Sequence, residues 1–72
     1  MESVIRHSRG IVREFDRARG YGIIQEESGG ELIVRYSAIA GEGVRTLKRG
    51  DRVSFNVAQT SRGLSAVHVT RD

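Results

Sequence analysis

The feature that most constrains the fold of this chain is a series of short strand-like stretches separated by turn sequences. In the clearest stretches, β-branched or aromatic residues alternate with polar ones, which is typical of half-buried β-strands. The intervening segments are rich in Gly, Asp and Ser, and no stretch has the apolar spacing of an amphipathic helix. We therefore predict an all-β protein with strands over residues 10–15, 21–25, 31–35, 52–59 and 64–70.

The connecting segments give the remaining predictions about local structure. The acidic, glycine-ended segment 26–30 is the clearest hairpin signal, and we expect its glutamates to lie at a solvated tip. Residues 1–8 are polar and have no clear period, so we expect a loosely docked tail over 1–9 and a domain over 10–72. Shorter predictions are turns at 16–20 and 60–63, one helical turn at 36–40 and a long loop at 41–50.

A small sheet of this kind either closes on itself or leaves aggregation-prone edges. We therefore predict a small five-stranded antiparallel barrel of the oligonucleotide/oligosaccharide-binding (OB) type. A small SH3-like barrel has the same number of strands, and the strand pattern alone does not separate the two. The 72 residues fit one domain with a thin core, in which Phe55 should be buried because it alternates with Val53 and Val57.

Composition adds weak constraints on partners and compartment. The chain has 12 Lys+Arg and 9 Asp+Glu, a formal net charge of +3, and all but one of its cations are arginine. This balance is compatible with nucleic-acid binding, although many other proteins share it. The absence of cysteine excludes disulfides and suits a reducing cytosol. Since no apolar run is long enough to span a bilayer, we expect a soluble cytoplasmic protein.

The densest run of informative residues is 19–24, which reads RGYGII. Its glycines permit tight turning and close approach of another backbone. In a strand, Tyr21 and Ile23 share one face and Ile24 takes the other. Ile24 can therefore reach a core while Tyr21 is displayed to a partner, which the segment alone does not identify.

The order and spacing of several blocks resemble the bacterial cold-shock domain over residues 10–70. The resemblance implies an OB barrel of the cold-shock type that binds single-stranded RNA or DNA with little sequence preference. It implies an RNA chaperone or a regulator of transcription or translation, in which rings on the first three strands stack on bases. The matching blocks are 10–15 (GIVREF), 19–24 (RGYGII), 32–39 (LIVRYSAI), 43–50 (GVRTLKRG), 53–55 (VSF), 62–63 (RG) and Val69.

The chain departs from the family pattern on this stacking surface. Glu14 stands where the family typically has tryptophan, and Ile23 and Ile33 each stand where it has a ring. Stacking is worth roughly 1–3 kcal/mol per base, so we expect a weakened or re-tuned binder. Arg35 replaces a histidine and offers a guanidinium that stacks on bases and pairs with phosphate. Simple strand alternation would send Glu14 to the face of Val12, which the family avoids with a local irregularity.

These considerations give the predicted binding residues. Basic side chains around the rings should hold the phosphates, and the isoleucines should form an apolar floor. The predicted stacking rings are Phe15, Tyr21 and Tyr36. The predicted floor is Ile23 and Ile33. The predicted phosphate contacts are Arg13, Arg19, Arg35 and Arg62.

A second hypothesis is a protein-interaction module built on a cold-shock scaffold. An apolar patch of Phe15, Tyr21, Ile23 and Ile33 that lacks flat rings at two positions suits a protein surface. We expect a monomer, with a homodimer through this patch as the variant of this hypothesis.

The sequence gives no sign of a metal site, a cofactor or a catalytic centre. His7 and His68 are far apart in the chain, and no cysteine accompanies them, so a zinc site is not expected. The sequence has no phosphate-binding loop and no nucleophile with a paired base. We therefore expect a binding protein without cofactor rather than an enzyme.

Overall fold

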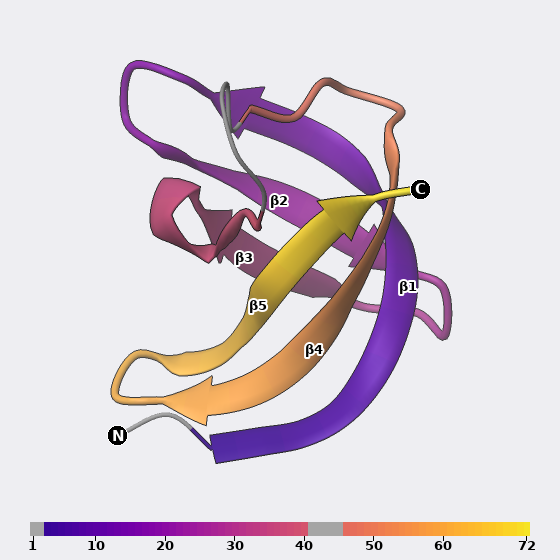
Figure 1. The fold of residues 1–72 in the computed structure, drawn as a ribbon, viewed down its shortest axis with the longest axis vertical. Helices are drawn as coiled ribbons and strands as arrows, with labels where there is room; N and C mark the ends of the chain where they lie inside the picture. Colours follow the sequence, from indigo (N-terminus) through magenta and orange to yellow (C-terminus); the bar gives the residue numbers. More distant parts are fainter. Residues whose placement is uncertain (1–2, 41–45) are drawn as a thin grey trace.

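The strands form a closed five-stranded barrel, which confirms the predicted fold class. The computed structural model describes residues 3–40 and 46–72; residues 1–2 of the predicted tail and 41–45 of the predicted loop lie outside the described residues. The elements in chain order are β1 (Ser3–Asp16), β2 (Tyr21–Glu26), β3 (Glu31–Arg35), the 3₁₀ turn η1 (Tyr36–Ala38), β4 (Arg52–Thr60) and β5 (Gly63–Arg71) (Figure 1).

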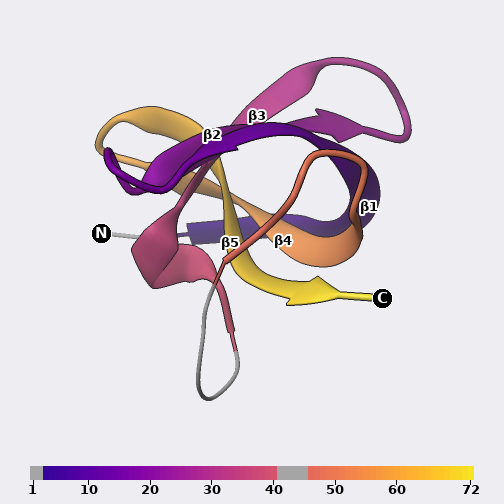
Figure 2. The same ribbon diagram turned by 90° about the horizontal axis from the view of Figure 1, so that it is seen from above.

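The order of the strands around the barrel is β1-β2-β3-β5-β4. The long strand β1 takes part in two pairings: its first part lies antiparallel to β4 and its second part antiparallel to β2. The remaining strand pairs are also antiparallel except for β3 and β5, which run parallel where Ile33 meets Ser65 and Val34 meets Ala66. Figure 2 shows β1 bending around the barrel so that it reaches both of its neighbours.

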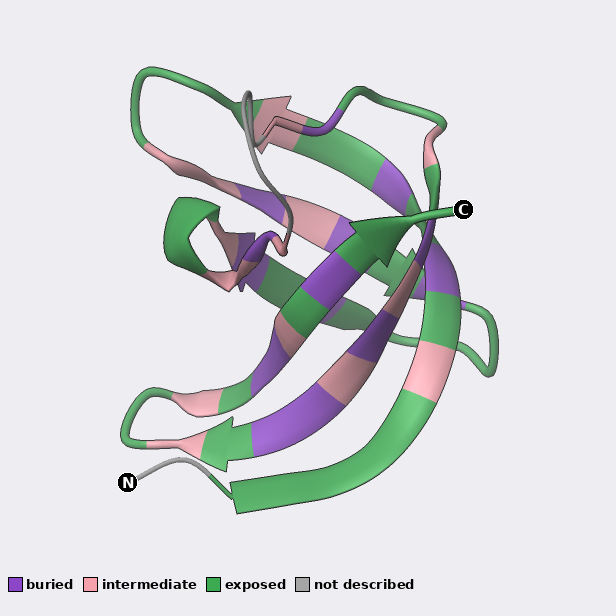
Figure 3. Ribbon diagram, in the orientation of Figure 1, coloured by how far each residue is buried: buried purple, intermediate pink, exposed green. Residues whose placement is uncertain are grey.

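The start of β1 differs from the prediction. The strand begins at Ser3, not at residue 10, and Ser3 pairs with Gln59 at the far end of β4. The prediction of a loosely docked tail is therefore wrong from Ser3 onwards. The register shifts between Val4 and Arg6, and this irregularity hides the strand period in the sequence. Most residues of this half of β1 are exposed, so burial leaves no apolar pattern there either (Figure 3).

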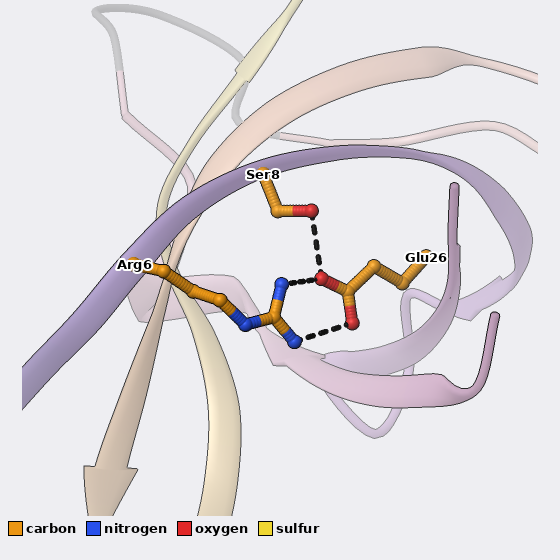
Figure 4. Close-up of polar contacts among 3 residues, drawn as sticks. All are labelled: Arg6, Ser8 and Glu26. Carbon is orange, nitrogen blue, oxygen red and sulfur yellow. Dashed lines mark hydrogen bonds and ion pairs between the residues drawn. The ribbon is translucent and has the colours of Figure 1, made fainter. Parts of the chain in front are cut away.

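Glu26 also departs from the prediction, because its side chain is 5% exposed rather than at a solvated tip. Arg6 approaches both of its carboxylate oxygens, with Nη2 donating to Oε1 at 2.9 Å, and Ser8 Oγ donates to Oε2 at 2.7 Å (Figure 4). The hydrogen bonds from Arg6 lower the pKa of Glu26 from 4.5 to about 2, against the opposing effect of burial. This cluster ties the first half of β1 to the end of β2.

The core lies inside the barrel and follows the strand alternation. Phe55 is fully buried, as predicted, and Val53 and Val57 beside it are buried with it. Full burial of a side chain of this size contributes about 1.5–3 kcal/mol to the free energy of unfolding. Ile39, just after η1, and Leu47, in the segment before β4, belong to the same cluster. The buried core therefore lies within the barrel, and the candidate site lies on its surface.

Candidate nucleic-acid interface

The three predicted stacking rings come from three consecutive elements. Phe15 lies near the end of β1, Tyr21 begins β2 and Tyr36 begins η1. Phe15 and Tyr21 are half-buried and line one shallow hollow. Tyr36 is 47% exposed, and its backbone N–H donates to the carbonyl of Gly20, the residue before Tyr21. The structure therefore brings the rings to one region around the β1–β2 turn.

Gly22 fixes how β1 and β2 approach each other at this point. It pairs with Phe15 across the two strands. A Cβ on Gly22 would clash with the carbonyl oxygen of Glu14 and would lie 2.7 Å from Cδ1 of Phe15. Only glycine lets the Phe15 ring lie this close to β2. Phe15 also packs against the core, so the ring belongs to the barrel as well as to the surface.

The two predicted floor residues lie opposite each other. Ile23 pairs with Ile33 across β2 and β3. Ile33 is 41% exposed, whereas Ile23 is half-buried. A third isoleucine, Ile11 of β1, is 48% exposed and lines a hollow together with Ile23 and Phe15. Sequence reasoning missed Ile11, although its place next to the buried Val12 in a strand would have identified it.

A local irregularity in β1 keeps Glu14 out of the core. The pairing of β1 with β2 shifts between Val12 and Glu14, so Glu14 falls opposite Ile23. Val12 is 1% exposed, while Glu14 is exposed at the surface. The expected irregularity is therefore present, and it avoids the large free-energy cost of burying an unpaired carboxylate. Its result is a negative charge in the same hollow as Phe15 and Ile23.

Two of the four predicted phosphate contacts are already paired with carboxylates. Arg13 forms an ion pair with Glu31 of β3, and Arg19 Nε lies 3.6 Å from Oδ2 of Asp16. The pKa of Arg19 is raised, chiefly by a hydrogen bond with Tyr21. These arginines lie beside the rings, but their charge is partly satisfied within the protein.

The other two, Arg35 and Arg62, line one hollow of about 910 Å³. Arg35 ends β3 and pairs with Tyr21 across the strands, whereas Arg62 lies in the turn between β4 and β5. Neither forms an ion pair within residues 3–40 and 46–72. Two further cations, Lys48 and Arg49, line the hollow that contains Phe15 and Ile23. Sequence reasoning left these two out because they lie in a loop whose course the sequence does not specify.

Comparison with known proteins places the chain in a family. Residues 8–72 match the family model described as "'Cold-shock' DNA-binding domain". The chain belongs to the cold-shock domain family. It is 43% identical over 63 residues to "Cold shock protein CspB" of Bacillus caldolyticus, a match that covers 88% of this chain and 96% of that protein. It is 44% identical over 61 residues to a "Cold shock-like protein" of Thermotoga maritima, covering 85% of this chain and 92% of that protein.

Membership of the cold-shock domain family confirms the resemblance in the sequence and is consistent with the OB-type barrel. The family match begins at residue 8, so the first residues of β1, from Ser3 to His7, lie before it. In this cold-shock domain those residues nevertheless continue the pairing with β4 and carry the Arg6 partner of Glu26. The structure thus adds a strand segment that the family match does not include.

The described part of this cold-shock domain shows neither a membrane helix nor a metal cluster. No helix within residues 3–40 and 46–72 has the length and apolar character needed to cross a bilayer. In the same residues, no three His, Cys, Asp or Glu side chains gather as a ligand set for a metal ion.

Proposed function

We propose that this cold-shock domain binds single-stranded RNA or DNA and acts as an RNA chaperone or as a regulator of transcription or translation. The observation that carries the proposal is the gathering of Phe15, Tyr21 and Tyr36 around the β1–β2 turn, next to Arg35. Bases stack on aromatic faces without regard to sequence, while guanidinium groups hold the phosphates. We also propose that the protein is a cytoplasmic monomer without enzymatic activity or cofactor.

The composition of the surface supports weak rather than strong stacking. Ile23 and Ile33 offer apolar contact to a base but not a flat π-face. Glu14 adds a negative charge near the expected course of the phosphates, which repels them. Each ring that remains is therefore expected to carry a large share of the binding free energy.

The ion pairs divide the predicted phosphate contacts into two groups. Arg35 and Arg62 can bind a phosphate without breaking an ion pair to a carboxylate among the described residues. Arg13 and Arg19 must first exchange Glu31 and Asp16 for the phosphate, which cancels part of the gain. We therefore assign the main electrostatic contribution to Arg35 and Arg62.

A titration tests the proposed function. A fluorescently labelled thymidine oligomer of about ten nucleotides should bind at about 50 mM salt and more weakly at about 200 mM. Tyr21→Ala should weaken binding by roughly 1–3 kcal/mol, because one stacking ring is lost. Its matched control is Phe55→Leu, which alters a fully buried ring. Absence of binding by the unmodified protein at low salt would refute the proposal.

The pair Ile23 and Ile33 favours a second candidate function, a protein-interaction surface. With Phe15 and Tyr21 they form a patch that is partly exposed and only partly aromatic. Such patches often mark protein interfaces. If this function holds, a defined protein partner should bind the chain, and Ile33→Asp should abolish that binding while leaving the unfolding midpoint nearly unchanged. A nucleic-acid affinity that drops as much as partner binding would argue for one shared surface.

A further inference from the structure

A large surface hollow lies beyond the predicted stacking rings. It has a volume of about 910 Å³ and extends from η1 across β5 to the turn between β4 and β5. Arg35, Arg62 and His68 line it, and Val4 from the first half of β1 closes one side. None of the three rings lines this hollow, so it is distinct from the proposed stacking platform that Phe15, Tyr21 and Tyr36 form.

The strand register connects the platform to this hollow. Ile23 lies opposite Ile33, and Ile33 lies opposite Ser65 of β5. Ser65 in turn lies opposite Ala58 of β4, and Ala58 opposite Val4 of β1. A single cross-strand row therefore runs from the isoleucine floor to the added segment of β1. The two residues in the middle of this row, Ser65 and Ala58, have small side chains, and Ser65 lines the hollow.

The hollow differs from its neighbours in charge. Two arginines and a histidine line it, and no carboxylate is among its described lining residues. The two hollows beside the rings each contain carboxylates, from Glu14 and Glu31 in one and from Glu14 and Asp16 in the other. A phosphate therefore meets less repulsion in this hollow than beside the rings.

The turn that carries Arg62 is held in place by its own hydrogen bonds. Thr60 Oγ1 donates to the carbonyl of Gly63 at 2.9 Å and accepts from the backbone N–H of Arg62 at 3.2 Å. A fixed turn reduces the conformational entropy that Arg62 loses when it binds a ligand.

His68 is a conformational exception within β5. Its φ of 55° makes it the one non-glycine residue with positive φ in the described chain. Residues held in this region often occur at binding sites, where the surrounding structure maintains the strain. The positive φ lies where the pairing of β5 with β4 shifts register, between the pairs Ser54–Thr70 and Asn56–Val67, so it belongs to a β-bulge. The His68 side chain is exposed at this bulge and lines the hollow.

We propose that this hollow binds the phosphodiester backbone of the same single strand whose bases stack on the rings. The inference rests on the proposed function and extends it: the binding site continues past Arg35, over β5, to Arg62 and His68. A strand long enough to reach the hollow gains backbone contacts there that a strand confined to the platform lacks.

Four oligonucleotides, two of them with an abasic extension, test the inference in anisotropy titrations at low salt. One is a thymidine oligomer of about four nucleotides, one has about ten thymidines, and two carry about four thymidines with an abasic extension of about six units, each at a different end. The ten-nucleotide strand should bind at least tenfold more tightly than the four-nucleotide strand. One of the abasic strands should retain most of this gain, since the hollow contacts phosphates and not bases.

Two variants test whether the tighter binding of the longer strand arises in the hollow. Ser61→Asp places a carboxylate among its lining residues, and His68→Asn removes the imidazole while keeping a residue that tolerates positive φ. Both variants should reduce the ratio of the ten-nucleotide affinity to the four-nucleotide affinity by about threefold or more. Their affinity for the four-nucleotide strand should stay within about twofold of that of the unmodified protein. Arg52→Ala, which makes the same charge change as Ser61→Asp but lines a different hollow, is the control and should leave the gain intact.

The outcomes separate this inference from the proposed function. If the four-nucleotide strand binds but a longer strand binds no more tightly, single-strand binding on the rings stands, whereas backbone binding in the hollow and the assignment of Arg62 as a main phosphate contact are refuted. Backbone binding in the hollow is also refuted if the abasic strands lose the gain, or if Ser61→Asp weakens short and long strands equally. If neither strand binds the unmodified protein, both proposals fail.

Discussion

Two arginine–glutamate pairs connect the strands of this barrel, and their surroundings are opposite. Arg6 of β1 meets Glu26 of β2 where the glutamate is 5% exposed, with Ser8 as an additional donor (Figure 4). Arg13 of β1 meets Glu31 of β3 at the surface, where the two side chains are 57% and 45% exposed. The same two chemical groups are thus part of the fold in one place and part of the proposed binding face in the other.

The difference follows from solvation. A buried carboxylate cannot replace a lost partner with water, so removing Arg6 leaves an uncompensated charge on Glu26, whereas the side chain of Arg6 is itself 46% exposed. An exposed pair is screened by solvent and exchanges partners at little cost in free energy. The Arg6–Glu26 pair therefore should govern stability, whereas the Arg13–Glu31 pair should govern how much positive charge a ligand meets.

The largest expected effect is on stability. Glu26→Gln keeps the shape of the side chain but removes the charge, and should lower the free energy of unfolding by about 2 kcal/mol. The matched variant Glu31→Gln should change it by less than about 0.5 kcal/mol. Urea unfolding measures both, as a shift of the midpoint at constant slope. Equal losses for the two variants would contradict the contrast between the pairs.

The contrast between the two ion pairs should also appear in how the free energy of unfolding depends on pH. The folded pKa of Glu26 is lowered to about 2, so its contribution to stability is fully present above 4.5, its ordinary pKa. As the pH falls from there through about 2, the carboxylate is protonated and this contribution is lost. The stability difference between the unmodified protein and Glu26→Gln should therefore shrink from about 2 kcal/mol at neutral pH to a small remainder at about pH 2, and vanish below it.

Unfolding curves at several pH values measure this difference directly. Other carboxylates titrate in both proteins, so the comparison between them isolates Glu26. A difference that persists undiminished at about pH 2 would mean that the Arg6–Ser8–Glu26 cluster does not depend on the charge of Glu26.

Substitutions on the proposed binding face should have a smaller effect, which is a change in how the affinity for a single strand depends on salt. Arg35→Ala should reduce the slope of log affinity against log salt by about 0.7, the value for one phosphate contact on a single strand. Arg13→Ala should reduce it by clearly less, because its charge is already shared with Glu31. Oligonucleotide titrations across a salt series provide the slopes. A larger reduction for Arg13→Ala than for Arg35→Ala would reverse the assignment of the main phosphate contacts.

Much of the barrel could be predicted from sequence because its strands carry their own signals. The alternation of Val53, Phe55 and Val57 marks one buried face of β4, and the structure buries all three. The motif around Tyr21, with the other blocks of the resemblance, placed the rings on consecutive elements. Local pattern was sufficient wherever one face of a strand is buried and the register is regular.

The first half of β1 and the buried Glu26 could not be predicted in this way. The register shift between Val4 and Arg6 breaks the alternation, and the exposed residues there have no apolar period. Glu26 stands next to turn residues, so its local sequence predicts a solvated side chain, whereas the fold brings Arg6, distant in sequence, against it. The pairing of Arg13 with Glu31 was hidden for the same reason, since long-range partners follow from the fold and not from local sequence.

The smallest expected effect is a gain of affinity. Glu31→Gln frees the guanidinium of Arg13 from its surface ion pair, so Arg13 becomes available to a phosphate near Phe15 and Ile23. Single-strand affinity at low salt should rise by about 0.2–1 kcal/mol, the usual strength of an exposed pair. Glu26→Gln, measured where it is fully folded, should leave the affinity unchanged because its partner Arg6 lies away from the rings in β1. An unchanged affinity for Glu31→Gln would place Arg13 outside the path of the strand, and the binding face would then begin at Phe15.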